Sequence, residues 1–397
     1  MDEMPPTARG TVPALTGEMS PSVTEVTRLP AAQATSDEFL LNIGPQHPAT
    51  HGVLRVVVTM DGEVVKNIVP HIGYVHRGLE KLFENRTYEQ IIPFTDRTDY
   101  LSAIANNFAY VMGVERLLGL EVPKKVEYMR VLMAELNRIS SHLLWLAAYG
   151  LDMGAFTPFL YAFRDREEIG AMIEEASGGR LTTNYFRVGG FVHDLPKGFF
   201  PRLRKFVSRF GKAVNELDTL LVENAIFVAR TRGVGSIGRE RAVSYGMTGP
   251  CLRASNAAFD VRREMPYSIY PSLNFEIPVG RNGDTWDRSW VRIEEMRQSL
   301  AILRQAMDGF PEGDHRARAP RNIEPPAGEV YSAVEGPRGE IGFYIVSDGT
   351  HKPFRVKMRK PSFSNFSALP EILRGLKIAD LVAVMGSLDL VVPEIDR

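Results

Sequence analysis

The pattern of apolar positions changes character twice along the chain. Residues 38–69 contain three runs of strand length, "EFLLNIG", "VLRVVVTM" and "EVVKNIV", and Asp61-Gly62 between the last two predicts a hairpin. Residues 99–310 instead repeat apolar side chains at helical spacing, and residues 328–361 return to strand-like runs. This order predicts an α+β protein with a long-helix core and small antiparallel β subdomains at both ends.

Capping residues and prolines set the expected limits of five long helices. A cap is a side chain or glycine that satisfies the unpaired backbone groups of a helix end. The first helix is expected to end near Gly119, and Pro123 and Gly150 are expected at the two ends of the second. The remaining expected caps are Thr157 (before Pro158) and Gly178 for the third helix, Asp194 for the fourth and Asp284 for the fifth.

The same pattern divides the chain into four parts. Residues 1–36 hold five prolines and few large apolar residues, which is typical of a disordered or partner-draped tail. Residues 37–75 are expected to form an N-terminal antiparallel β subdomain with a histidine loop. Residues 76–325 are expected to form the helical core, and residues 326–397 a C-terminal β subdomain with a terminal element.

The histidine loop is the stretch "GPQHPATHG", residues 44–52. Pro48 lacks an N–H and keeps His47 out of the helical region, so the sequence predicts a rigid, non-helical loop between two strands. Four of the eight histidines, His47, His51, His71 and His76, fall in this part of the chain. They could hold a metal, but no acidic pair at ligand spacing accompanies them. For His71 and His76 we favour hydrogen bonding to loop backbone.

Acidic residues at helix ends supply further candidates. "FTDRTDYL" places Asp96, Arg97, Asp99 and Tyr100 at a helix start, where helix capping and a buried aromatic are the simplest interpretation. Asp152 directly follows the second predicted long helix, where a negative charge opposes the helix dipole. We therefore expect a tertiary partner for Asp152. A histidine is one candidate, because a carboxylate would raise its pKa and select its tautomer.

Composition narrows the possible chemistry. The chain has 47 basic and 48 acidic residues, so it has no basic excess for nucleic acid. Cys251 is the one cysteine, which excludes a disulfide within the chain and any iron–sulfur cluster or structural zinc held by its cysteines alone. "ARTRGVGSIG" lacks the Lys-Ser/Thr ending of a phosphate-binding loop. We find neither an apolar run of transmembrane length nor a secretory signal, so any membrane association is expected to be peripheral.

Long motifs, in order, carry a resemblance to a known family. They include "NIGPQHPATHGVLRVVV", "PHIGYVHRGLEKL", "RTDYL", "ELNRISSHLLWL", "LDMGAFTPFLYAFRDRE", "NYFRVGG", "GEIGFYIVSDGTHKPFRVK" and the final "EIDR". From about Leu40 to Arg397 the chain resembles the D subunit of NADH:quinone oxidoreductase, respiratory complex I. The resemblance implies a fold like the large subunit of nickel–iron hydrogenases, with no metal. Their two Cys-x-x-Cys pairs are absent here, and the vacated cavity would take a quinone head group.

The resemblance also implies roles for particular residues. His51 and Tyr100 would hydrogen-bond the two quinone carbonyls, with Asp152 behind His51. Other matched positions would line or support the site: His47, Arg97, Ser102, Phe159, Asp389, Val391 and Arg397.

Cofactors and partners follow from the same resemblance. Quinone would be the substrate, while NADH, FMN and the iron–sulfur clusters would belong to partner subunits. Those partners would be other peripheral-arm subunits, especially the small subunit with the terminal cluster, and membrane-arm subunits. The chain would act only in the assembled, proton-translocating complex, at the cytoplasmic face of the cell membrane. A non-catalytic scaffold in a ferredoxin- or deazaflavin-dependent quinone reductase is the alternative, and the cysteine count disfavours a hydrogenase.

The sequence departs from the family pattern at two places. "RLTTNYFRVGG" has Thr182 and Thr183 where the family often has a histidine near the cluster, so a redox-linked proton site there is in doubt. Between "NIEPP" and "AGEVY", about two dozen residues of a usual helical segment are missing, in a position where deletions are commonly tolerated. The chain is either a shortened natural variant or an incomplete sequence.

Overall fold

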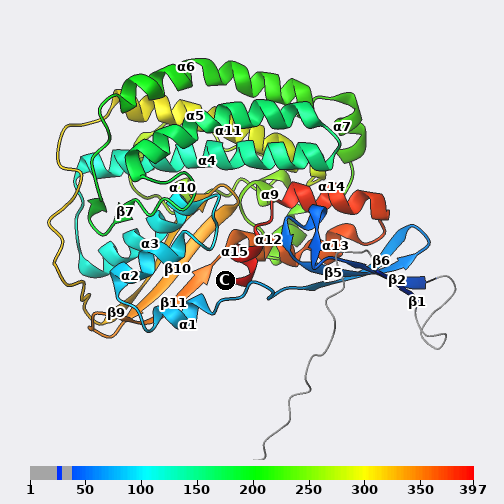
Figure 1. Cartoon of the computed structure of the whole chain (residues 1–397), viewed down its shortest axis with the longest axis horizontal. Coiled ribbons are helices and arrows are strands. Elements are labelled where there is room, and N and C mark those ends of the chain that lie inside the picture. The colour runs from blue at the N-terminus through cyan, green and yellow to red at the C-terminus, as the bar shows by residue number, and fades with distance from the viewer. Residues whose placement is uncertain (1–24, 29–37) are drawn as a thin grey trace, which may run out of the picture.

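The computed structural model describes residues 25–28 and 38–397 (Figure 1). The predicted tail over residues 1–36 therefore lies outside the described residues, apart from a short strand at Glu25–Arg28. The rest combines long helices with small antiparallel sheets, which confirms the predicted α+β class. No helix in the described ranges is both long and apolar enough to cross a membrane.

The N-terminal sheet has four antiparallel strands in the order β1-β2-β5-β6. They are β1 (Glu25–Arg28), β2 (Glu38–Ile43), β5 (Arg55–Asp61) and β6 (Val64–His71). Asp61 pairs with Val64 across a two-residue turn in which Gly62 has a φ of 56°, so the predicted hairpin is confirmed. Alternate residues of β5 are buried in a core shared with helices α13 (Leu369–Leu373) and α14 (Ile378–Leu388).

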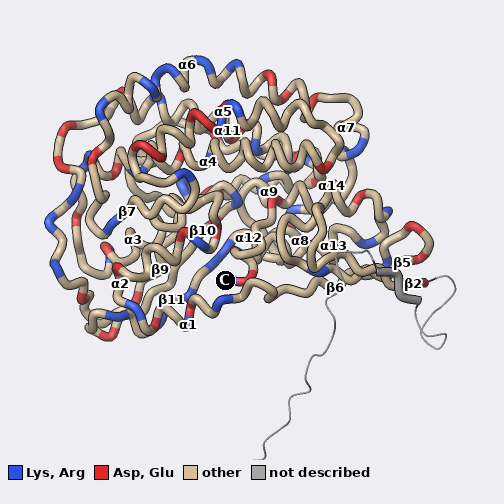
Figure 2. Tube along the Cα trace, in the orientation of Figure 1, with Lys and Arg blue, Asp and Glu red and all other residues tan. Residues whose placement is uncertain are grey.

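Long helices stack above the sheets in Figure 1, with α6 outermost. They are α3 (Ala103–Leu118), α4 (Lys124–Asp152), α5 (Phe156–Ser177), α6 (Phe199–Leu217) and α11 (Thr285–Asp308). α4 packs against both α5 and α11, and it is buried along most of its length. A π-helical segment, Asp218–Val222, extends α6. The charged residues of α6 are mostly basic and those of α5 mostly acidic (Figure 2), and they form pairs such as Arg202–Glu175 and Arg209–Asp165.

Two of the three predicted glycine helix ends, and the Asp284 cap, are confirmed. Gly119 and Gly178 adopt the left-handed conformation directly after α3 and α5. The Asp284 side chain accepts a hydrogen bond from the Asp287 N–H at the start of α11.

Three other predicted helix limits are wrong. α5 begins at Phe156 after Ala155, because only Met153–Ala155 separate it from α4 and Thr157 is already in its first turn. α6 begins at Phe199, and Asp194 instead binds the Lys125 ammonium at 2.6 Å. α4 continues past Gly150, so Asp152 is the last residue of the helix rather than the residue after it.

Shorter elements connect these layers. They are the helices α1 (Leu79–Phe83), α2 (Tyr88–Thr95), α7 (Ala225–Thr231), α8 (Arg239–Ser244), α9 (Gly249–Ala254) and α10 (Val261–Glu264), the 3-10 turns Pro48–Thr50 and Tyr270–Ser272, and the strand pairs β3 (Gln46–His47) with β4 (Gly52–Val53) and β7 (Phe186–Arg187) with β8 (Gly190–Phe191).

The C-terminal sheet runs in the order β11-β10-β9 and packs against α3. Its strands are β9 (Gly328–Gly336), β10 (Gly339–Ser347) and β11 (Pro353–Arg359). After β11 the chain forms α12 (Pro361–Ser367), α13, α14 and α15 (Val392–Asp396). The C-terminus returns to the middle of the molecule between the two sheets (Figure 1).

The last residues hold the segment that follows β6. The Asp396 carboxylate accepts hydrogen bonds from the Gly73 and Val75 N–H groups at 2.8 and 2.9 Å. The His76 ring nitrogen Nδ1 lies 2.7 Å from the Asp396 carbonyl oxygen, which confirms the predicted backbone-binding role for His76. These contacts fix α15 beside the segment that follows β6, while α14 packs against the Pro48–Thr50 part of the histidine loop.

Candidate functional site

The histidine loop folds into a compact turn with its own hydrogen bonds. Residues Pro48–Thr50 form a 3-10 turn, so the expectation of a wholly non-helical loop is wrong. Proline is accepted because it occupies the first position, where its missing N–H has no partner to lose. His47 is extended, as predicted, and the Thr50 hydroxyl lies 2.7 Å from the His47 carbonyl oxygen and 2.8 Å from that of Gly52. The turn therefore presents His51 from a fixed backbone.

His51 meets Asp152 from the end of α4. The His51 Nε2 lies 2.6 Å from Asp152 Oδ2, and the two side chains are 25% and 14% exposed. Burial lowers the pKa of His51, but the hydrogen bond to Asp152 and the charges of Asp152 and Asp389 outweigh it, so the pKa is raised above 6.5. The expected tertiary partner of Asp152 is thus a histidine, and the pair favours the imidazolium.

Helix α14 packs closely behind this pair. A Cβ built on Gly386 would lie 2.4 Å from Tyr149 Cδ2 and 3.4 Å from Asp152 Oδ2, so only glycine fits there. The indole N–H of Trp145 donates to the Gly386 carbonyl oxygen at 2.8 Å, and the Tyr149 hydroxyl donates to that of Ala383 at 2.9 Å. These contacts fix the end of α4 and hence Asp152. Sequence reasoning missed Gly386, whose signal is a glycine inside an apolar helix.

Tyr100 lies in the turn between α2 and α3. The Asp99 carboxylate accepts a hydrogen bond from the Leu101 N–H at 3.0 Å and shapes this turn. Burial raises the pKa of Tyr100, the charges of Asp99 and Asp389 add to the rise, and Arg338 opposes it. Within the described ranges, no protein group hydrogen-bonds the Tyr100 hydroxyl. Tyr100 is therefore a protonated phenol at neutral pH that is free to donate to a ligand.

Arg338 connects the two sides of the site, and sequence reasoning missed it. Its guanidinium is fully buried, binds the Asp99 carboxylate and lies 3.1 Å from Asp389 Oδ2. Asp389 ends α14, and its charge acts on both His51 and Tyr100. Arg338 lies between Pro337 and Gly339 in the β9–β10 turn, so the sequence suggests only a surface turn residue.

The other predicted residues occupy varied places. Arg97 binds Asp96 at 2.7 Å, and the His47 Nδ1 accepts from the Ala49 N–H within its own turn. The hydroxyl of Ser102 is buried without a hydrogen-bond partner. Phe159 packs between Phe156 and Phe163 on α5, Val391 is buried before α15, and Arg397 lies over the Phe363 ring. Charge interactions thus connect His51, Asp152, Tyr100 and Asp389. His47 instead bonds within its own turn, and Arg397 contacts Phe363 and Met358.

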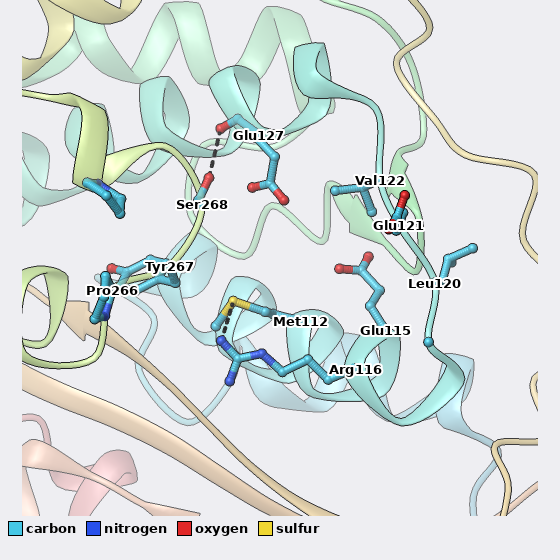
Figure 3. Close-up of a pocket in the computed structure, with 12 residues that line it drawn as sticks. Met112, Glu115, Arg116, Leu120, Glu121, Val122, Glu127, Pro266, Tyr267 and Ser268 are labelled. Carbon is cyan, nitrogen blue, oxygen red and sulfur yellow. Dashed lines mark hydrogen bonds between the residues drawn. The ribbon is translucent and has the colours of Figure 1, made fainter.

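A cleft of about 710 Å³ lies elsewhere, between the α3–α4 connection and residues 266–271 (Figure 3). Glu115 and Glu127 point into it, together with Met112 and Tyr267. None of the candidate site residues lines it, so we do not assign it to the quinone. Among the described residues, no group of three or more His, Cys, Asp or Glu side chains is arranged to hold a metal ion.

Comparison with known proteins identifies the family. Residues 152–397 match the family model for the 49 kDa subunit of respiratory-chain NADH dehydrogenase, and the chain belongs to this family. The D subunit of the NADH-quinone oxidoreductase of Dehalococcoides mccartyi (strain 195) is 53% identical over 363 residues, covering 91% of this chain and 99% of that protein. The D subunit of the Desulforamulus reducens enzyme is 50% identical over 361 residues, with the same coverage. The protein is thus a subunit of an NADH-quinone oxidoreductase complex.

The comparisons also bear on the missing segment. The D subunit of the Geotalea uraniireducens enzyme aligns over 389 positions at 48% identity, covering 92% of this chain and all of that protein. The Dehalococcoides alignment needs only 363 positions for almost the same share of this chain. The Dehalococcoides relative therefore aligns with this chain almost without gaps, so relatives of this shorter length exist.

Proposed function

We propose that this subunit binds the quinone head group between His51 and Tyr100 and supplies protons for its reduction. The observation that carries the proposal is the His51–Asp152 contact at 2.6 Å, with the raised pKa that it gives to His51. An imidazolium next to a carboxylate can donate a proton near neutral pH. The Tyr100 hydroxyl, without a protein acceptor in the described ranges, offers a second donor.

The chemistry suits these two groups. Reduction of a quinone to a quinol takes two electrons and two protons, and positioned acids are needed for the protons. Electrons would come from an iron–sulfur cluster in the adjacent small subunit. His51 would protonate one quinone oxygen and Tyr100 the other. Asp152 stabilises the His51 imidazolium before reduction and is left without a counter-charge afterwards.

That unpaired charge is the local event that we propose to couple quinone reduction to proton pumping. The Gly386 contact places α14 against Asp152, so a change of charge there acts on a helix that also carries Asp389. We further propose a fold similar to that of the large subunit of nickel–iron hydrogenases, with FMN and iron–sulfur clusters in partner subunits. The subunit would lie at the cytoplasmic face of the membrane, as a peripheral protein beside membrane-arm subunits.

The test is the Tyr100→Phe variant of the assembled complex. The phenylalanine keeps the ring and removes the proton donor, so we expect quinone turnover to fall and the quinone KM to rise. Reduction of ferricyanide by NADH, which does not need the quinone site, should stay at the wild-type level. Unchanged turnover and unchanged quinone affinity would instead support a scaffold without a chemical role.

A further inference from the structure

Lys360, between β11 and α12, carries a buried ammonium group. It is 1% exposed, and lysine is almost never buried to this extent unless it is paired. The ammonium donates to Thr98 Oγ1 at 2.9 Å and to the side-chain oxygen of Asn106. Among the described residues it has no ion pair with a carboxylate, so its partners are neutral oxygens.

Several charged groups surround Lys360 at longer range. Glu394 of α15 and Asp99 attract the ammonium, Glu80 of α1 does so weakly, and Arg397 repels it. The ammonium also lies 4.8 Å from the centre of the Phe343 ring of β10. Burial is the largest influence and lowers the pKa of Lys360 to about 8, so the ammonium loses its proton within an accessible pH range.

Glu394 is the carboxylate whose charge acts most strongly on Lys360. Its Oε2 accepts from the Ser362 N–H at 3.0 Å and lies 3.9 Å from the Arg338 Nε, while its Oε1 is buried without a partner. Burial and the charge of Asp99 raise the pKa of Glu394 to about 7, against the opposing charges of Arg338 and Lys360. Loss of the Lys360 charge therefore leaves these acids less compensated.

The two oxygens that bind Lys360 belong to the turn that carries Tyr100. Thr98 starts this turn, and its hydroxyl donates to the Thr95 carbonyl oxygen at 2.6 Å. Asn106 holds the other end, because its side-chain N–H donates to the Ser102 carbonyl oxygen at 2.9 Å. Lys360 thus joins both ends of the segment 98–102, with Tyr100 between them.

We propose that Lys360 is a positioning residue, whose ammonium holds the 98–102 turn so that the Tyr100 hydroxyl points toward the quinone. The inference rests on the proposed role of Tyr100. A charged donor binds hydroxyl and amide oxygens more strongly than a neutral amine does. The turn is therefore held most firmly below the pKa of Lys360 and loosens as the pH rises through it.

The test uses Lys360→Met in the assembled complex, with Lys357→Met as the matched control. Lys357 lies three residues earlier, on β11, pairs with Glu80 at 2.9 Å and is half exposed. We expect Lys360→Met, which removes both hydrogen bonds of the ammonium, to raise the quinone KM about tenfold at neutral pH. In the wild type the KM should rise above pH 8, and this rise should be absent from the variant. The control should match the wild type.

Two further variants separate positioning from a merely structural role. If Lys360→Met lowers assembly, the double variant Lys360→Met/Glu394→Gln also removes the uncompensated carboxylate and should restore the yield while keeping the flat KM profile. In a Tyr100→Phe background, Lys360→Met should have no additional effect, because it acts through Tyr100.

The outcomes distinguish this inference from the proposed function. A wild-type KM and pH profile in Lys360→Met, together with impaired Tyr100→Phe, would overturn the role of Lys360 alone. Fully additive effects of the two substitutions would overturn it as well. A Tyr100→Phe variant that behaves as wild type would overturn the proposed function itself, whatever Lys360→Met does.

Discussion

The side chains of His51 and Asp152, 101 positions apart in the chain, meet at 2.6 Å. One comes from a proline-bounded turn between two short strands, and the other from the last residue of α4. The helix dipole disfavours a negative charge at that end. The contact with His51 compensates for it and raises the pKa of the imidazole at the same time.

The first prediction concerns Asp152→Asn. The substitution removes the charge that raises the pKa of His51 and leaves burial, which lowers it. The imidazolium should then lose its proton at a lower pH, so the alkaline limb of quinone turnover should move toward lower pH. The measurement is the pH profile of quinone reduction by membranes that contain equal amounts of complex. Equal rates and equal proton pumping in both proteins would contradict the role given to Asp152.

The same pair makes stability depend on pH, with a sign that follows from linkage. The pKa of His51 is higher in the folded protein than its ordinary value of 6.5. The pair therefore contributes fully below pH 6.5, and its contribution is lost as the pH rises through the raised pKa. We expect the wild-type complex to be inactivated at a lower temperature as the pH rises through the raised pKa of His51. The Asp152→Asn complex lacks the pair, so its inactivation temperature should not show this pH-dependent fall.

Gly386→Ala tests the packing behind Asp152. The new Cβ would lie 2.4 Å from Tyr149 Cδ2, and such overpacking costs about 1–3 kcal/mol. We expect earlier thermal inactivation and slower quinone turnover, because the end of α4 must shift. Gly170→Ala is the control, since a Cβ there meets nothing within 4 Å inside α5. It should be neutral or stabilise by about 0.4–1 kcal/mol. Similar behaviour of the two variants would argue against a tight α4–α14 contact.

Arg338→Met tests the buried link between Asp99 and Asp389. Removing one partner of a buried ion pair costs about 3–5 kcal/mol, because the remaining charges stay buried without compensation. We expect little assembled complex on native gels. Arg355→Met is the matched control: Arg355 is 45% exposed and pairs with Glu84, a kind of pair worth about 0–1 kcal/mol. Normal assembly with Arg338→Met would show that the link is dispensable.

Local sequence signals were sufficient for much of the fold. Asp61-Gly62 predicted its hairpin, and Gly119, Gly178 and Asp284 marked helix ends correctly, because each depends on backbone geometry within a few residues. Asp194 failed as a cap because Lys125, distant in sequence, takes its carboxylate. An aspartate that caps a helix and an aspartate that binds a distant lysine cannot be distinguished from the neighbouring sequence.

For the site too, the sequence predicted what depends on local features and missed what depends on distant contacts. The dipole argument correctly required a partner for Asp152, and a histidine was among the candidates. It could not reveal Arg338 or Lys360, because a basic residue in a turn or after a strand is usually solvated. Their surroundings depend on α15, which returns between the two sheets (Figure 1) and brings Glu394 near both residues.

The most direct measurement is the structure of the assembled complex with quinone bound in its head-group site. The account predicts one quinone oxygen within about 2.7–3.2 Å of the His51 ring nitrogen and the other within similar reach of the Tyr100 hydroxyl. A quinone head group that is bound and oriented for reduction, but touches neither side chain, would contradict it.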